Sequence, residues 1–420
     1  MSSVVISKSP LVVVRPSEPV TATGSEIALS TYDKVVPMVE TVFCVYEHPI
    51  HEPAEIIRRG LSQALVHYYP VAGRLATGAT SGDVVIKCTG EGVSFVAASA
   101  NCAIKDVADL CDSSLQEELA LYYPAVGFSH SEPLMLMQVT VFSCGGCIVG
   151  LTWNHQLCDG IGLAQFFRAV GELACGLPSP SVVPVRSADS IMFDLPASVA
   201  NCARIAATLQ PFPRASQNIT LPSSLIDGIR RRYSMSSNDG PCTVFEAVAA
   251  VLWQCRTRAI RSDPDSLVML SFTADARKYA SAKKGYYGNC VTIHLVAATS
   301  GMVTNGDVVD LVKMIHRAKV PMPDQSIMDE LQRLHGYNLL SLSSLRNFGV
   351  GFDFGAGGPA RLMSYRRQRI GLPFCAVCVP CKDEHNVMAK CVREEHADAF
   401  LQEISNIQLN STCLSAPSKP

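Results

Sequence analysis

The chain has 420 residues, of which 48% are hydrophobic and 17% are charged, and its formal net charge is −2. This length exceeds what one ordinary hydrophobic core supports, and the composition is that of a well-buried globular protein, so we expect two domains and exclude a disordered chain. A net charge this small gives no electrostatic footprint for nucleic acid, and no apolar run approaches the roughly 20 residues of a membrane span.

The N-terminal segment and the cysteines bear on the compartment. Residues 1–16 lack the basic and then apolar layout of a signal peptide. The 17 cysteines are odd in number and lie mainly in apolar stretches, for example at Cys88, Cys290 and Cys391. Reduced thiols in a protein core explain this usage better than disulfides do. We therefore expect a cytoplasmic protein.

The first half of the chain mixes helical and strand patterns. Pro53 stands at a helix start, where its missing N–H is harmless. Further along, two apolar segments are joined through Gly145-Gly146, which predicts a tight hairpin turn. The predicted elements are a helix over 53–68, strands over 83–88, 92–97, 134–142 and 147–153, and a helix after Gly160.

A proline- and serine-rich segment over 176–184 and a polar stretch over 211–222 separate the two halves. They predict an N-terminal domain over 1–180, a connecting segment over 181–216 and a C-terminal domain over 217–420. In the second half, Thr243 and Glu246 form a capping box at a helix start. The predicted elements there are helices over 243–258, 306–319 and 395–407, and strands over 267–275, 289–297 and 374–380. The fold class is therefore α/β, of the mixed α+β kind.

One short segment carries the clearest chemical signal. Residues 153–160 read Trp-Asn-His-Gln-Leu-Cys-Asp-Gly, which places His155 at the end of an apolar strand and Asp159 just before a helix. Reactive groups are commonly presented on such loops. A neutral imidazole accepts a proton near neutral pH, so His155 is a candidate general base. Asp159 is the expected helix N-cap, bonded to backbone amides or to an arginine rather than acting in a relay.

Several other patterns have simpler structural explanations. His155 and Asp159 have no third metal ligand nearby in the sequence, and Cys158 is better explained as a packed thiol than as a nucleophile. The spacing Cys375-x-x-Cys378-x-x-Cys381 with His385 suggests a metal site, yet an apolar strand would point these sulfurs to alternate faces. We expect no metal. Cys144 and Cys147 flank a tight turn and are close enough in sequence to approach each other.

The glycine-rich stretch around Asp353-Phe-Gly355 resembles a kinase or dinucleotide motif only superficially. No phosphate loop precedes it and no helix pattern follows it, so a turn that needs positive φ is preferred. The basic residues form two local clusters that are either solvated faces or contacts for a cosubstrate phosphate. These are Lys278, Lys283 and Lys284, and Arg366, Arg367 and Arg369.

Taken together, the motifs make the chain similar to the BAHD family of plant acyl-CoA-dependent acyltransferases. Each motif alone is modest, but eight in the family's order over nearly the whole length are highly specific. They are His67–Leu75, Cys88–Val93, Gln138–Gly146, His155-x-x-x-Asp159-Gly160, Thr243–Ala247, Asp275-Ala-Arg277, Tyr287-Gly-Asn289 and Asp353-Phe-Gly-Ala-Gly357.

The resemblance implies two domains related to chloramphenicol acetyltransferase, with a channel at their interface. It implies that His155 is the general base and that Asp159 turns away to pair with Arg277. Asp353 is grouped with His155 in the family's active site, although the expected role of Asp353, Gly355 and Gly357 is structural. Contacts to the cosubstrate are expected from Ser271, Thr273, Lys283 and Lys284.

The activity implied by the resemblance is acyl transfer from acyl-CoA to a hydroxyl or amine of a small specialised metabolite. The transfer is expected to be direct, in a ternary complex of a monomer, with no bound cofactor. In one departure from the family pattern, Ala356 stands where the family usually has tryptophan, which would leave a cavity or widen the channel. The rival hypotheses are a non-catalytic binding partner with the same fold and an enzyme that takes its acyl group from a carrier protein.

Overall fold

The computed structural model divides the chain into two compact units, each described here by itself. Unit 1 comprises Met1–Leu195, Asp275–Val291 and Asn347–Gln368, and unit 2 comprises Pro196–Ala274, Thr292–Arg346 and Arg369–Pro420. Both units combine helices with sheets, which confirms the mixed fold class. The residues that the structure describes are 4–79, 83–107, 113–124, 129–195, 200, 213–319, 334, 336–346, 352–365, 371–378 and 384–414.

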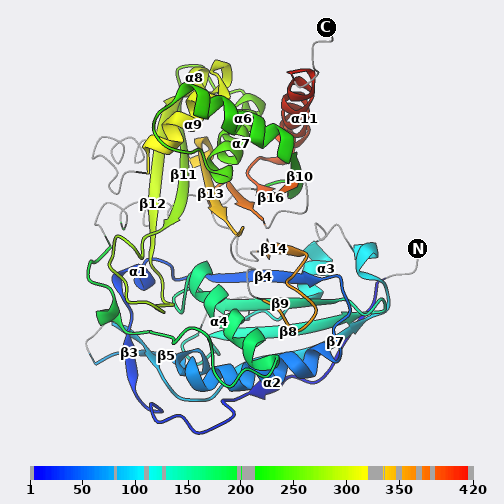
Figure 1. Cartoon of the computed structure of the whole chain (residues 1–420), viewed down its shortest axis with the longest axis vertical. Coiled ribbons are helices and arrows are strands. Elements are labelled where there is room, and N and C mark those ends of the chain that lie inside the picture. Colours follow the sequence, from blue (N-terminus) through cyan, green and yellow to red (C-terminus); the bar gives the residue numbers. More distant parts are fainter. Residues whose placement is uncertain are drawn as a thin grey trace. The chain divides into compact units, whose positions relative to one another are not determined.

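The main sheet of unit 1 has seven strands in the order β1-β7-β8-β9-β4-β14, with β2 also paired to β7 (Figure 1). Only β7 and β8 run parallel among the registers recorded for this sheet. The predicted hairpin is confirmed as β8 and β9, joined at Gly145-Gly146. The strand bounds are β1 Ile6–Lys8, β2 Val12–Val14, β4 Val39–Tyr46, β7 Val93–Ala100, β8 Met135–Phe142, β9 Cys147–Asn154 and β14 Arg361–Tyr365.

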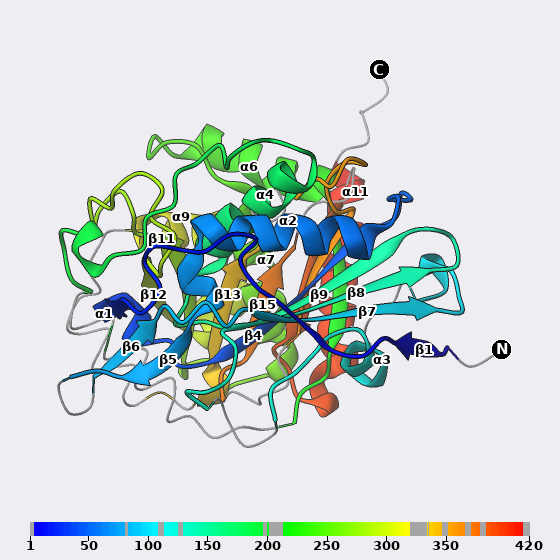
Figure 2. The same ribbon diagram turned by 90° about the horizontal axis from the view of Figure 1, so that it is seen from below.

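A second, three-stranded sheet in unit 1 has the order β3-β6-β5. Its strands are β3 Glu26–Ala28, β5 Arg74–Thr77 and β6 Val84–Lys87. Two long helices, α2 (Pro53–His67) and α4 (Gly160–Ala174), pack side by side in the same unit (Figure 2). Gly60 permits this close approach, since a Cβ there would lie 2.4 Å from the carbonyl oxygen of Val170. The short elements of unit 1 are α1 Thr31–Lys34, η1 Tyr69–Ala72, η2 Ile104–Val107, α3 Ser113–Glu118 and η3 Ala188–Ser190.

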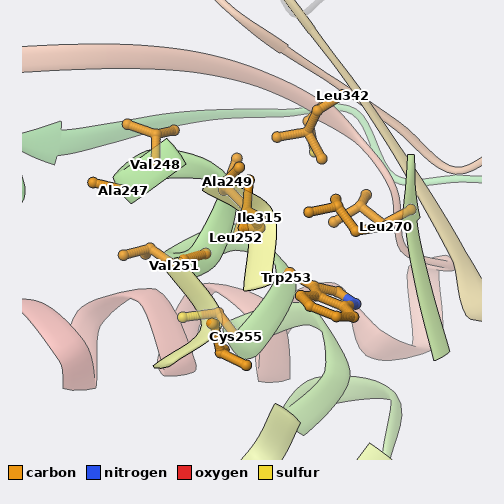
Figure 3. Packing of buried hydrophobic residues seen from close by; sticks show 14 of the residues in the cluster. Ala247, Val248, Ala249, Val251, Leu252, Trp253, Cys255, Leu270, Ile315 and Leu342 are labelled. Carbon is orange, nitrogen blue, oxygen red and sulfur yellow. The ribbon is translucent and has the colours of Figure 1, made fainter. Parts of the chain in front are cut away.

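Unit 2 has a six-stranded sheet in the order β10-β16-β15-β13-β11-β12. Helix α7 (Val244–Ile260) is buried in the hydrophobic core of this unit. Figure 3 shows α7 side chains, including Trp253, packed with Leu270, Leu342 and Ile315. The capping box of Thr243 and Glu246 is confirmed. The remaining elements are α6 Ser223–Ser236, α8 Ser300–Asn305, α9 Val308–Arg317, η4 Gly336–Asn338, η5 Glu394–His396, α11 Ala397–Leu414 and strands β10 Gln217–Pro222, β11 Leu267–Asp275, β12 Val291–Thr299, β13 Leu339–Ser344, β15 Phe374–Val377 and β16 Glu384–Lys390.

The compact units are interleaved along the chain, whereas we expected the consecutive segments 1–180, 181–216 and 217–420 from the sequence. The interleaving arises because β14 crosses back to pair with β4, so the segment that carries Asp353 belongs to unit 1. Residues 275–291 also belong to unit 1, where they contact the loop after β9. None of the helices in the described ranges is both long enough and apolar enough to cross a membrane.

Candidate active site

His155 follows directly after β9, on the loop that leads to α4. Its backbone N–H donates to the carbonyl oxygen of Met38 at 2.8 Å. The imidazole is half-buried and stacks on Trp153, with ring centroids 5.9 Å apart. Its Nδ1 is buried and has no hydrogen-bond partner among the described residues. The ring is thus oriented by packing, and none of the recorded hydrogen bonds employs its Nδ1.

The carbonyl groups of this loop are held by two side chains from distant segments. Asn289 Nδ2 donates to the carbonyl oxygen of His155 at 2.7 Å. Arg186 donates from Nε to the carbonyl oxygen of Leu157 at 3.0 Å and from Nη2 to that of Gln156 at 3.1 Å. Three consecutive peptide carbonyls are therefore fixed, which restricts how the loop can present the imidazole.

Both of these side chains are themselves tied to Asp33, whose side chain is fully buried. Asp33 Oδ1 accepts from Asn289 Nδ2 at 2.8 Å, and Oδ2 lies 3.0 Å from Arg186 Nη2. Burial lowers the pKa of the Arg186 guanidinium, but the charge of Asp33, together with Tyr286, Tyr287 and Cys158, raises it overall. Asp33 also forms a capping box with Ser30 at the start of α1. A single carboxylate thus organises α1 and both loop-holding side chains.

Asp159 is the N-cap of α4, as the sequence predicts. Its Oδ1 accepts from the backbone N–H of Gly162 at 2.8 Å and from Arg277 Nη2 at 2.9 Å, and its Oδ2 accepts from the N–H of Cys290 at 2.9 Å. Burial lowers the pKa of Arg277, but the charges of Asp159 and Asp275 and their hydrogen bonds raise it overall. Both carboxylate oxygens of Asp159 therefore hold the surrounding structure, and in the described residues no recorded hydrogen bond joins Asp159 to the side chain of His155.

The first turn of α4 packs directly on the segment that carries Asn289. A Cβ at Gly162 would lie 1.8 Å from the carbonyl oxygen of Tyr287, so only glycine fits there. Gln165, one turn further on, donates to the carbonyl oxygen of Gly285 at 2.9 Å. The predicted Gly160 is the first residue of the helix. The motif loop and the 285–290 segment thus form one packed assembly within unit 1.

Comparison with known proteins identifies the family to which the chain belongs. A family model described as the Transferase family matches residues 4–396. Acyl transferase 15 of Oryza sativa subsp. japonica is 43% identical over 439 residues, covering 97% of this chain and 99% of that protein. The chain is a member of the BAHD acyltransferase family.

Further BAHD relatives and solved structures extend the comparison. A myricetin 3-O-glucosyl 1,2-rhamnoside 6'-O-caffeoyltransferase of Crocosmia x crocosmiiflora is 32% identical, covering 96% of this chain and 99% of that protein. The crystal structure of vinorine synthase has a TM-score of 0.75 at 17% identity, covering 96% and 98% of the two chains. F. sporotrichioides TRI101, complexed with coenzyme A and T-2, has a TM-score of 0.72 at 15% identity, covering 91% and 98%. These two structures establish the fold.

The BAHD motif around Asp353 forms a separate loop in unit 1. Asp353 is exposed, and its Oδ1 accepts from the N–H groups of Gly355 at 2.8 Å and Gly357 at 2.9 Å. Both glycines have positive φ, +96° and +91°, as the turn interpretation predicts. In the described part of the chain, no recorded contact joins Asp353 to His155. The geometry of this carboxylate is that of a turn-forming group.

Two phenylalanines of the Asp353 loop pack against α4. Phe352 and Phe354 are buried, with ring centroids 4.9 Å and 6.2 Å from that of Phe167 on α4. The hydroxyl of Tyr46 donates to the carbonyl oxygen of Phe352 at 2.9 Å. Ala356, where the family usually has tryptophan, is only partly buried. The loop is therefore held against α4 by Phe352 and Phe354 and not by the residue at position 356.

The residues expected to contact a cosubstrate are divided between the two units. Ser271 is buried in β11 and Thr273 is exposed on the same strand, both in unit 2. Lys283 and Lys284 belong to unit 1 and are exposed in the turn before Gly285. Their cosubstrate role stays a prediction. Lys278 is described, whereas Arg366, Arg367 and Arg369 lie outside the described residues.

The cysteine hypotheses have different outcomes. Cys158 is fully buried, and burial raises the pKa of its thiol, as the packed-thiol interpretation predicts. Cys375 and Cys378 are buried on or beside β15, while Cys381 lies outside the described residues. Where residues are described, no group of three or more His, Cys, Asp and Glu side chains is placed to hold a metal ion.

Proposed function

We propose that this BAHD acyltransferase moves an acyl group from an acyl-CoA thioester to the hydroxyl, or the amine, of a small specialised metabolite, with His155 as the general base. The observation that carries the proposal is that the side chains around His155 hold the loop, whereas the imidazole of His155 does not. Asp159, Asn289 and Arg186 are occupied in holding the loop, whereas the His155 imidazole is half-buried and its Nδ1 has no hydrogen-bond partner among the described residues. The imidazole of His155 is thus not committed to a recorded structural hydrogen bond, which supports its assignment as the base.

In this mechanism, His155 removes the proton of the acceptor as its oxygen or nitrogen attacks the thioester carbonyl carbon. Proton removal of this kind contributes about 10²–10⁴-fold to the rate. The tetrahedral intermediate then collapses, the carbon–sulfur bond breaks, and the departing thiolate of CoA receives the proton from His155. Transfer is direct in a ternary complex of a monomer, with no acyl-enzyme and no bound cofactor.

The oxyanion of the intermediate needs hydrogen-bond donors that are in place before the reaction. We assign this task to a backbone amide or hydroxyl within 271–273 or 353–358. Asp353 contributes by shaping its loop through the N–H groups of Gly355 and Gly357. Ser271, Thr273, Lys283 and Lys284 are the proposed cosubstrate contacts, with the lysines offered to a CoA phosphate.

The relatives support the substrate classes. The Crocosmia enzyme is named as a 6'-O-caffeoyltransferase of a myricetin 3-O-glucosyl 1,2-rhamnoside, and TRI101 was crystallised with coenzyme A and with ethyl coenzyme A. On that basis, we favour O-acylation over N-acylation and aromatic acyl donors over acetyl or malonyl donors. The proposed setting is specialised metabolism in the plant cytoplasm.

A panel assay tests this proposal. The wild-type protein is incubated with acetyl-, malonyl-, benzoyl- and coumaroyl-CoA and with plant alcohols and amines, and released thiol is measured. Acceptor-dependent release identifies the donor. A burst of CoA release without acceptor would contradict direct transfer. Silence over the whole panel, with a folded protein, would favour a non-catalytic binding partner, and activity only with an acyl carrier protein would favour the carrier-dependent alternative.

A further inference from the structure

Two cysteines lie in neighbouring segments at the edge of the unit 1 sheet that carries the β8–β9 turn. The parallel strands β7 and β8 end with Ala100 opposite Phe142. Cys102 and Cys144 each stand two residues past these strand ends. There, the N–H of Ser143 donates to the carbonyl oxygen of Cys102 at 3.0 Å, and the N–H of Ile104 donates to Cys144 Sγ at 3.4 Å. Residues 102–104 therefore contact residues 143–144, and Cys144 acts electrostatically on the thiol of Cys102.

The two thiols differ in chemistry. Cys144 is exposed, and its Sγ accepts a hydrogen bond from the backbone N–H of Ile104 at 3.4 Å. This backbone donor lowers the pKa of the Cys144 thiol despite an opposing contribution from burial. Cys102 is partly exposed, and burial together with the charge of Asp106 raises the pKa of its thiol. Because the thiolate is the nucleophile, Cys144 is the thiol suited to attack and Cys102 the thiol suited to resolve.

The other described cysteines near this turn or on the surface do not combine an exposed thiol with a lowered pKa. Cys147, which the sequence places beside Cys144, is buried in β9 opposite Val141, and burial raises its pKa to about 12. Cys175 is exposed like Cys144, but burial and the charge of Asp353 raise the pKa of its thiol. Cys175 is therefore a matched control for accessibility without activation.

We propose that Cys144 and Cys102 are a peroxide-responsive thiol pair that closes to a disulfide. The Cys144 thiolate attacks one oxygen of hydrogen peroxide, the O–O bond breaks, and the products are a sulfenic acid and, after protonation of hydroxide, water. The Cys102 sulfur then attacks the sulfenic sulfur, and the S–O bond breaks. The departing hydroxide takes the Cys102 proton as a second water. Two thiols lose two electrons, and one peroxide is reduced to two waters.

The pair is distant from the catalytic loop along the sheet. The eight residues of β9 separate the turn from His155, which corresponds to about 25 Å of extended strand. The disulfide would tie η2 to the hairpin without touching the proposed catalytic groups. The inference is independent of the proposed function, and its test needs no substrate.

Peptide mapping and intact mass after mild peroxide treatment test the inference in the full chain. We expect the wild type to lose two hydrogens, to yield a peptide joined through Cys102 and Cys144, and to return to its original mass with dithiothreitol. Cys175→Ser should behave identically. Cys102→Ser should accumulate a dimedone-reactive sulfenic acid at Cys144, and Cys144→Ser should form no link at Cys102.

Three results would overturn the inference. The first is oxidation of wild-type Cys144 to sulfinic acid without a link to Cys102. The second is equal dimedone labelling of Cys144 and Cys175 in Cys102→Ser. The third is a cross-link at Cys102 that persists in Cys144→Ser.

Discussion

The side-chain amide of Asn289 joins the carbonyl oxygen of His155, at 2.7 Å, to the buried carboxylate of Asp33, at 2.8 Å. Both hydrogens of the amide are used, so Asn289 couples the backbone of the catalytic loop to the buried Asp33–Arg186 pair. The imidazole that we propose as the base therefore depends on this buried group of side chains for its position.

Asn289→Ala removes this coupling. We expect a fall in kcat of about 10-fold with little change in KM, and a loss of about 1–3 kcal/mol of stability from the buried groups left unpaired. Steady-state kinetics and denaturant unfolding measure the two effects. Asn218→Ala, at an exposed position on β10, is the control and should change neither. An Asn289→Ala enzyme with normal kcat would show that the loop needs no such anchor.

Arg277 has one buried and one exposed carboxylate partner, which provides an internal comparison. The side chain of Asp159 is 3% exposed, and that of Asp275 is 45% exposed. Asp159→Asn leaves a largely buried guanidinium without its main counter-charge, so we expect a loss of about 3–5 kcal/mol. Asp275→Asn should cost about 0–1 kcal/mol. Urea unfolding of both variants tests the assignment, and equal losses would refute it.

The contact between α4 and Tyr287 predicts a strong dependence on one glycine. Gly162→Ala would place Cβ 1.8 Å from a backbone oxygen, so α4 or the 285–290 segment must shift, and we expect a large fall in melting temperature and activity. Gly228→Ala, in α6, meets no atom within 4 Å and should stabilise the protein by about 0.5–1 kcal/mol. Equal melting temperatures for the two variants would contradict the close packing of Gly162 on Tyr287.

Glu246 predicts how the stability of unit 2 depends on pH. Burial raises the pKa of this fully buried carboxyl, but hydrogen bonds from Lys319 and Thr243 outweigh burial and lower it. A lowered folded-state pKa means that the stabilisation is complete above the ordinary glutamate pKa of about 4.3 and is lost as the pH falls through the lower, folded value. Wild-type stability should thus fall more steeply below about pH 4.3 than that of Glu246→Gln. Parallel pH profiles of unfolding would contradict this.

Local patterns predicted the elements of the site well, and distant partnerships less so. The hairpin around Gly145-Gly146 and the helix after Gly160 follow from periodicity and glycine placement, which are local signals. The pairing of Asp159 with Arg277 was expected only from the family resemblance. The roles of Asp33 and Arg186 were missed, because nothing near either residue marks it as one half of a buried pair. Asp33 and Asn289 are 256 positions apart.

Two further outcomes differed from what the sequence predicted. The expected helix over 306–319 begins at Val308, because Gly306 ends α8 and Asp307 caps α9. Cys144 was considered with Cys147, its neighbour in sequence, yet its contacts beyond the ends of β7 and β8 are with residues 102–104. These contacts join segments about 40 positions apart, which local sequence patterns do not specify.

The most direct test of the central claim is the turnover number of His155→Ala, measured as acceptor-dependent CoA release at saturating substrates. His48→Ala, at an exposed histidine outside the loop, is the matched control. We predict that His155→Ala folds with an unchanged circular dichroism spectrum and loses about 10²–10⁴-fold in kcat, while His48→Ala turns over normally. Wild-type turnover in His155→Ala would show that this imidazole is not the general base.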